Sequence, residues 1–222
     1  SADLLNSTMN VLYIDQAGLG MGNRDYYLDA ANQALRDGYV QWLTKAFTMI
    51  GWEDAAAAAE KVLAFETKMA QSFRSNVQLR NVTANYNALT KEDLLAKYPD
   101  FSWGAYFSQM GIGEFDKVIV GQPEVIEAVI GLYNTEDIET VKAYLAASVI
   151  ASAAGYVGDE LYAAHFDFFG RQMSGQQEMR PRWKRAMAVP NRLLSDAIGQ
   201  VYVKKYFPES DKVRMTQMVK NL

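Results

Sequence analysis

Glycine occupies three alternate positions just after a short apolar run near the N-terminus: Gly18, Gly20 and Gly22. A glycine-rich loop between a strand and a helix could bind the phosphates of a dinucleotide, for which the fingerprint is G-x-G-x-x-G. Asn23 stands where the third glycine is needed, and residues 38–50 have a helical pattern where a second parallel strand should follow. The residues therefore favour a tight turn with glycines at positive φ, followed by a helix that Asn23 or Asp25 caps.

His165 is the only histidine, and the chain has no cysteine. A zinc-binding H-E-x-x-H helix needs two imidazoles one turn apart, but Phe166 and Phe169 stand where the glutamate and the second histidine would be. The G-x-S-x-G turn of a serine nucleophile is also absent from the sequence. We predict a core or edge histidine at position 165 and no catalytic, cofactor-binding or metal-binding residue in this chain.

Four cations gather in the segment RPRWKRAM: Arg180, Arg182, Lys184 and Arg185. Cations near a helix N-terminus oppose the helix dipole, so we expect these side chains to pair with carboxylates elsewhere in the fold. A site for a phosphate or a substrate carboxylate is the alternative, because arginine binds such anions readily. Trp183 is predicted to be a core anchor rather than a stacking platform.

Composition excludes several classes of partner. The chain has 222 residues and a formal net charge of −4, so no general attraction to nucleic acid or to an anionic membrane is expected. The longest uncharged run, residues 143–158, is shorter than the ~20 apolar residues that a membrane-spanning helix needs. We predict no transmembrane segment in this chain, and a packed helix in that run.

Apolar spacing predicts an all-α fold: a multi-helix domain with long helices and at most two short strands. The predicted helices cover 30–50, 53–73, 91–98, 102–110, 122–133, 136–169, 182–206 and 210–222. Thr90 and Thr135 are the expected caps of the helices that follow them, and Ser210 or Asp211 caps the last one. Residues 117–121 could form a brief strand, residues 75–89 form a loop, and no linker is visible, so residues 1–222 are predicted to be one domain.

The glycine segment, NVLYIDQAGLGMGNRDYYL, resembles a signature of the non-catalytic domain of the neprilysin and endothelin-converting-enzyme family of zinc metallopeptidases. That signature reads I-D-Q, then G-L-G-L, then R-D-Y-Y. The matching residues are Ile14, Asp15, Gln16, Gly18, Leu19, Gly20, Arg24, Asp25, Tyr26 and Tyr27. Met21 replaces the usual leucine, and Gly22 stands where the family often has proline.

Three further segments resemble family elements in the family's order. The segment YNALTKEDLLAKYPDFSWGAYF is similar to the Y-N-x-x-T-x-x-x-L element and the tryptophan-containing helix after it, and RWKRAM resembles the R-W-[KR]-R block. The segment AIGQVYVKKYF resembles A-x-G-x-[LV]-Y-V-x-x-x-F. The residues concerned are Tyr86, Asn87, Thr90, Leu94, Trp103, the run Arg182–Arg185, Ala197, Gly199, Tyr202, Val203 and Phe207.

The resemblance implies that the intact protein is a metalloendopeptidase with zinc as its cofactor and peptides as its substrates. This chain would be a fragment of the N-terminal domain, which covers the active-site cavity and restricts substrates to peptides. The H-E-x-x-H helix, the third zinc ligand and the histidine that stabilises the transition state would lie beyond Leu222, on the catalytic domain of the same polypeptide. The chain alone would then be inactive.

One departure from the family bears on the compartment. Animal members have a cysteine after the R-W-[KR]-R block, where this chain has Ala186. The resemblance then implies a bacterial enzyme that is periplasmic, secreted or lipid-anchored, with a cytoplasmic location left open. A stand-alone helical module that binds peptide or protein without catalysis is the alternative function.

Overall fold

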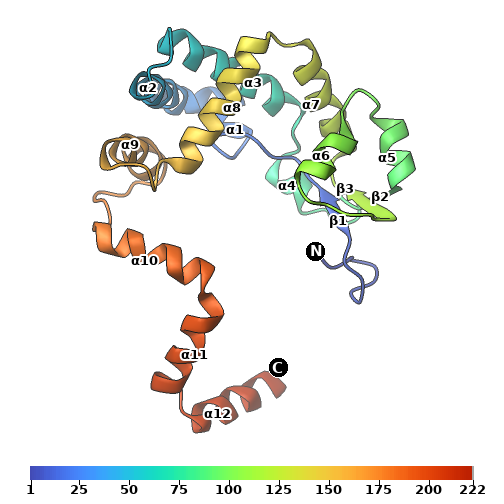
Figure 1. Ribbon diagram of the computed structural model, residues 1–222, viewed down its shortest axis with the longest axis vertical. Coiled ribbons are helices and arrows are strands. Elements are labelled where there is room, and N and C mark those ends of the chain that lie inside the picture. The colour runs from blue at the N-terminus through green and yellow to red at the C-terminus, as the bar shows by residue number, and fades with distance from the viewer. Residues whose placement is uncertain (222) are drawn as a thin grey trace. The chain divides into compact units, whose positions relative to one another are not determined.

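The computed structural model describes residues 1–221, in two compact units: residues 1–175, and a second unit that begins at Gln176. Helices make up most of both units, and the first contains one small sheet (Figure 1). The predicted all-α class is therefore confirmed. That residues 1–222 form a single domain stays a prediction.

Three long helices of the first unit form its main core. They are α2 (Gln33–Met49), α3 (Ala55–Ser72) and α8 (Ile138–Ala153), and α3 contacts both of the others. Each of α2 and α3 places its apolar side chains at steps of three and four residues, so one face is buried, as at Phe47 and Phe65. The helices predicted over 30–50 and 53–73 are confirmed within a few residues at each end.

The sheet has three strands in the order β1-β3-β2. Strand β1 (Leu12–Ile14) pairs in parallel with β3 (Lys117–Val120), which pairs on its other edge with antiparallel β2 (Asn87–Thr90). The side chains of the central strand β3 are fully buried from Val118 to Val120. The third strand, β2, was not predicted, because the segment around it is polar and lacks the alternation of a half-buried strand.

Three helices pack beside the sheet: α5 (Lys91–Lys97), α6 (Trp103–Gln109) and α7 (Pro123–Thr135). The Thr90 side chain accepts a hydrogen bond from the Asp93 amide, so the predicted cap of α5 is confirmed. The predicted loop 75–89 holds a single turn, α4 (Asn76–Leu79), which a capping box at Ser75 begins. A second short pair, α1 (Asp25–Leu28) and η1 (Ala30–Asn32), precedes α2.

The long helix predicted over 136–169 is wrong. The chain instead forms α8, α9 (Asp159–His165) and a π-helical segment, η2 (Phe166–Met173). Gly158 has φ 168°, an extended conformation that cannot continue a helix, and two glycines lower helix propensity in this stretch. The predicted cap is also wrong, because Asp137 rather than Thr135 accepts a hydrogen bond from the Thr140 amide, at 3.3 Å.

Replacing Asp137 by alanine is expected to lower the free energy of unfolding by about 1 kcal/mol, the usual loss for an N-cap. Thr135→Ala is the matched control and should change it by less than about 0.5 kcal/mol, since its hydroxyl only donates to the Gly131 carbonyl within α7. Urea unfolding followed by circular dichroism measures both. Equal losses in the two variants would contradict the assigned cap.

The second unit consists of α10 (Arg182–Leu193), α11 (Ser195–Tyr206) and α12 (Glu209–Lys220). The single helix predicted over 182–206 is wrong, because Leu194 leaves the helical conformation with φ −121° and ψ 28°. The predicted caps Ser210 and Asp211 lie inside α12, which Pro208 precedes.

No side chain of these three helices is buried in the part of the chain that the structure describes. The exposed large apolar residues are Trp183, Met187, Leu193, Leu194, Ile198, Val201, Tyr202, Val203, Tyr206, Val213, Met215, Met218 and Val219. The prediction of a core role for Trp183 is wrong within this chain, since 65% of the residue is exposed and the Lys184 ammonium lies 5.4 Å from its ring centroid. Among residues 1–221, no helix has the length and apolar content to cross a bilayer.

Candidate functional site

The glycine segment forms a turn with two glycines in the left-handed region. Gly18 has φ 104° and Gly22 has φ 82°, so the expectation of positive φ is met at these two positions. Between them the side chains of Leu19 and Met21 are buried, whereas Gly20 lies at the surface. The turn is thus a thin layer that is fixed to the core by two apolar side chains.

A buried carboxylate lies beneath this turn. Glu66 on α3 is only 2% exposed, and its Oε2 accepts a hydrogen bond from the Tyr27 hydroxyl at 2.7 Å. Its Oε1 accepts from the Tyr39 hydroxyl and from the Gly20 amide, each at 3.2 Å. The Met21 amide donates to the Tyr27 hydroxyl at 2.9 Å. The carboxylate therefore joins α1, α2 and α3 to the backbone of the turn.

Burial controls the electrostatics of this cluster. Loss of hydration raises the pKa of Glu66 to about 7, against the lowering effect of its three hydrogen-bond donors. Burial also raises the pKa values of Tyr27 and Tyr39, so both phenols are neutral near neutral pH. A carboxylate enclosed in this way cannot reach a substrate, so its role in the fold is to position the turn.

Tyr144 on α8 also holds the turn. Its hydroxyl donates to the Gly18 carbonyl at 2.8 Å, and a Cβ at Gly18 would lie 2.4 Å from that hydroxyl oxygen. Only glycine therefore satisfies both the φ angle and the close approach at this position.

Replacing Gly18 by alanine is expected to lower the free energy of unfolding by about 2 kcal/mol, half from the left-handed backbone and half from the displaced Tyr144 hydrogen bond. Gly131→Ala is the control, since that glycine lies within α7 and a Cβ there meets no atom within 4 Å. This control should raise the stability by about 0.5–1 kcal/mol. Denaturant unfolding measures both, and a neutral Gly18→Ala would contradict the geometry.

Gln16 of the same segment joins the turn to two other loops. Its side-chain amide donates to the Arg74 carbonyl at 3.0 Å and accepts from the Arg74 amide at 2.8 Å. The Gln16 amide donates to the side chain of Gln122 at 2.7 Å. Arg24 adds a further bond, from its guanidinium to the Phe73 carbonyl at 2.7 Å. The signature residues thus act as structural connectors.

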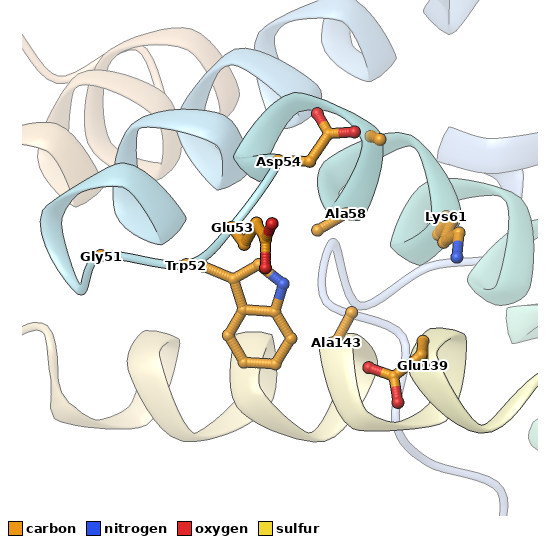
Figure 2. Close-up of a pocket in the computed structure, with 9 residues that line it drawn as sticks. Gly51, Trp52, Glu53, Asp54, Ala58, Lys61, Glu139 and Ala143 are labelled. Carbon is orange, nitrogen blue, oxygen red and sulfur yellow. The ribbon is translucent and has the colours of Figure 1, made fainter.

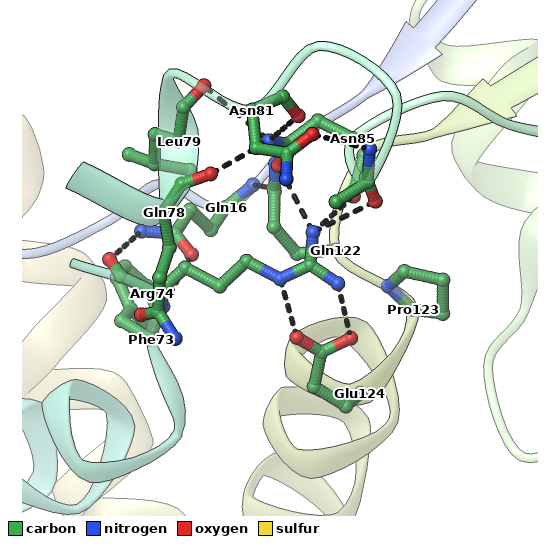
Figure 3. A network of polar contacts seen from close by, with 12 residues as sticks. Gln16, Phe73, Arg74, Gln78, Leu79, Asn81, Asn85, Gln122, Pro123 and Glu124 are labelled. Carbon is green, nitrogen blue, oxygen red and sulfur yellow. Dashed lines mark hydrogen bonds and ion pairs between the residues drawn. The ribbon is translucent and has the colours of Figure 1, made fainter. Parts of the chain in front are cut away.

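The Arg74 guanidinium is the centre of this junction (Figure 3). It forms a two-pronged ion pair with Glu124 at the start of α7, with Nη2 2.9 Å from Oε2. Its Nη1 donates to the carbonyls of Ala84 and Gly121 and to Oδ1 of Asn85, at 2.9 to 3.2 Å. One side chain therefore holds together the end of α3, the loop before β2 and the loop after β3.

A surface pocket of about 600 Å³ lies between the α2–α3 loop, α3 and α8 (Figure 2). Trp52 forms one wall of the pocket, and the charged residues that line the pocket include Lys61 and Glu139. Lys61 pairs with Asp137 at 3.3 Å, and Glu139 pairs with Lys142 at 2.7 Å. These two charges are thus used within the fold, and no serine, histidine or cysteine lines the pocket.

The other candidates from the sequence belong to other elements. His165 is half-buried, with its ring centroid 4.4 Å from that of Phe169 and 5.8 Å from that of Trp42, and burial lowers its pKa. Arg182, Lys184 and Arg185 lie at the start of α10 in the second unit. Within residues 1–221, no three His, Cys, Asp or Glu side chains are grouped so that they could hold a metal ion.

Three residues that connect these elements, Glu66, Arg74 and Gln122, were not predicted from the sequence. Glu66 shares the apolar spacing of α3 with Val62, Phe65 and Met69, and a carboxylate on a buried stripe is a signal that could have found it. Arg74 and Gln122 gave no such signal, because their partners lie far away in the sequence.

A family model and several known proteins match this chain over nearly its whole length. The family model described as peptidase family M13 matches residues 1–222. The chain is 28% identical to Neprilysin-11 of Caenorhabditis elegans, covering 100% of this chain and 28% of that protein. It is 26% identical to endothelin-converting enzyme 1 of Homo sapiens, covering 99% of this chain and 30% of that protein.

A solved structure agrees over nearly the same extent. The zinc metalloprotease Zmp1 of Mycobacterium tuberculosis in its open state superposes with a TM-score of 0.87 at 27% identity. The match covers 95% of this chain and 33% of that one. The chain thus spans about a third of the length of the relatives it matches.

Proposed function

Because the chain belongs to peptidase family M13, we propose that it is the covering, non-catalytic region of a zinc metalloendopeptidase that hydrolyses peptide bonds. The observation that carries this proposal is the match of the family model to residues 1–222, which the likeness to Zmp1 supports. The relatives include proteins named as endopeptidases, and this chain spans about a third of their length. Peptides are the proposed substrates.

The residues present do not fit a zinc site. The imidazole of His165 packs against aromatic rings, and the described residues offer no group of three metal ligands. On this proposal another part of the same polypeptide binds the zinc ion and supplies the chemistry. Residues 1–222 then contribute a wall of the cavity that admits peptides and keeps folded proteins out, as one covering domain.

The exposed apolar side chains of α10, α11 and α12 support a partner within the same polypeptide. Leu193 is 69% exposed and Val201 is 67% exposed, which is unfavourable in water when so many apolar side chains are exposed together. We propose that these helices contact the catalytic domain.

The proposed location is periplasmic, secreted or lipid-anchored in a bacterium.

The full reading frame and a peptidase assay test the proposal together. We expect an H-E-x-x-H motif downstream of Leu222, and we expect the intact protein to cleave a quenched fluorescent peptide. A zinc chelator should abolish this cleavage, and added zinc should restore it. A folded protein that contains a similar peptide sequence should stay uncut. Residues 1–222 alone should not cleave the peptide. A stop codon directly after Leu222 would overturn the proposal and support a stand-alone binding module.

A further inference from the structure

A second pocket, of about 300 Å³, lies in the first unit where the glycine turn meets the end of α3. Leu19, Asn23 and Arg24 line it from the glycine segment, and Phe73 and Arg74 line it from the end of α3. None of the described residues that line this pocket is an aspartate or a glutamate. Because both of its charged residues are arginines, the pocket attracts a negatively charged group.

The two arginines differ in what they have left to bind. The Arg74 guanidinium is directed at Glu124, which neutralises its charge, and its Nη1 also donates to other oxygens of the junction (Figure 3). The partly buried Arg24 donates one N–H to the Phe73 carbonyl at 2.7 Å, and no carboxylate of the described residues pairs with it. Arg24 therefore brings to the pocket an uncompensated charge and further N–H donors.

Two neutral donors are also available beside Arg24. The side-chain oxygen of Asn23 accepts from the Asp25 amide at 3.0 Å, which leaves the side-chain NH₂ group of Asn23 to donate. Tyr144 donates to the Gly18 carbonyl, and the N–H of a trans peptide points opposite to its carbonyl, so the Leu19 amide points away from Tyr144. No group of the described residues accepts a hydrogen bond from this amide, which is uncommon for a buried residue.

The charge and the apolar lining together define the ligand. One unpaired cation matches an anion of single charge, whereas a phosphate dianion would keep one charge uncompensated. The lining also includes the apolar side chains of Ala17, Phe73 and Leu79. We propose that this pocket binds a small aliphatic carboxylate, whose charged group pairs with Arg24 and whose hydrocarbon part contacts the apolar lining.

Nitrogen NMR of the full chain, titrated with 3-methylbutanoate at constant ionic strength, tests the proposal. The Leu19 amide and the Arg24 Nε–H should shift and saturate in the millimolar range, while the Val62 amide inside α3 stays unchanged. 3-Methylbutanamide has the same shape without the charge and should bind about tenfold more weakly. Inorganic phosphate should also bind more weakly. Absence of saturation, equal affinity for the amide, or tighter binding of phosphate would overturn the proposal.

Two variants assign the binding to Arg24. Arg24→Gln should weaken the binding of 3-methylbutanoate about tenfold. Arg80→Gln is the matched control, because Arg80 is exposed and does not line the pocket, so its loss should change the affinity by less than about twofold. Equal affinities in the wild type and in Arg24→Gln would overturn the proposal. If Arg24→Gln does not fold, the comparison of 3-methylbutanoate with its amide in the wild type decides.

A further ligand distinguishes two sources of the carboxylate. N-acetylleucine carries the same apolar group beside a peptide bond. It should bind more tightly than 3-methylbutanoate if the natural ligand is the end of a longer chain, and more weakly if the natural ligand is a free small acid.

Discussion

Replacing Arg74 by methionine is expected to lower the free energy of unfolding by about 2–3 kcal/mol, because a charged group that donates hydrogen bonds to several oxygens is lost. The Arg74 side chain is 17% exposed, and its guanidinium donates to Glu124, to the carbonyls of Ala84 and Gly121, and to Asn85. Methionine fills much of the same volume but leaves these oxygens without their donor in a partly enclosed site. Chemical denaturation followed by tryptophan fluorescence gives the loss.

Two further variants separate the parts of this effect. Arg74→Lys keeps the charge but cannot form the fork to Glu124 and also reach the carbonyls, so it should recover less than half of the loss. Glu124→Gln should lower the stability by only about 1 kcal/mol, because the glutamate side chain is 55% exposed and water can replace its partner. Equal losses in Arg74→Met and Glu124→Gln would contradict a role for the carbonyl contacts.

The sequence was informative where one periodicity extends over several turns. Helices α2 and α3 were predicted within a few residues, since their apolar stripes are long enough to define a buried face. The break between α8 and α9 was missed, because the composition of residues 136–169 favours a helix nearly throughout. Gly155 and Gly158, the second of which has an extended backbone, outweigh that average locally. Helix propensity alone does not reveal such a break.

The features of the glycine segment also divide into those that the sequence predicts and those that depend on packing. The positive φ at Gly18 and Gly22 could be expected from the residue type, because glycine adopts it without strain. The reason for glycine at position 20 could not, since a Cβ there would lie 2.0 Å from the Tyr39 hydroxyl oxygen. Such long-range approaches depend on how α1, α2 and α3 pack, which a single sequence does not specify.

The pH dependence of stability should differ between the wild type and Glu66→Gln. The pKa of Glu66 is raised from 4.5 in the unfolded chain to about 7 in the folded one. Its contribution to stability is then fully present below the unfolded value and is lost as the pH rises through the folded value. Between about pH 5 and about pH 8 this loss is about 2.5 kcal/mol, and glutamine, which does not titrate, removes it.

The measurement is the difference in unfolding free energy between the two proteins, taken by urea titration at both pH values. Subtraction cancels the other titrating groups, such as His165, because they are the same in both proteins. The wild type should lose about 2.5 kcal/mol more than Glu66→Gln as the pH rises. A second variant, Tyr27→Phe, removes the shorter of the two phenol hydrogen bonds, so the ionised carboxylate is less stabilised and the loss should grow. If the pH dependence were the same in the wild type and in Glu66→Gln, the carboxylate would have to be hydrated in the folded protein, and burial of Glu66 under the turn would be contradicted.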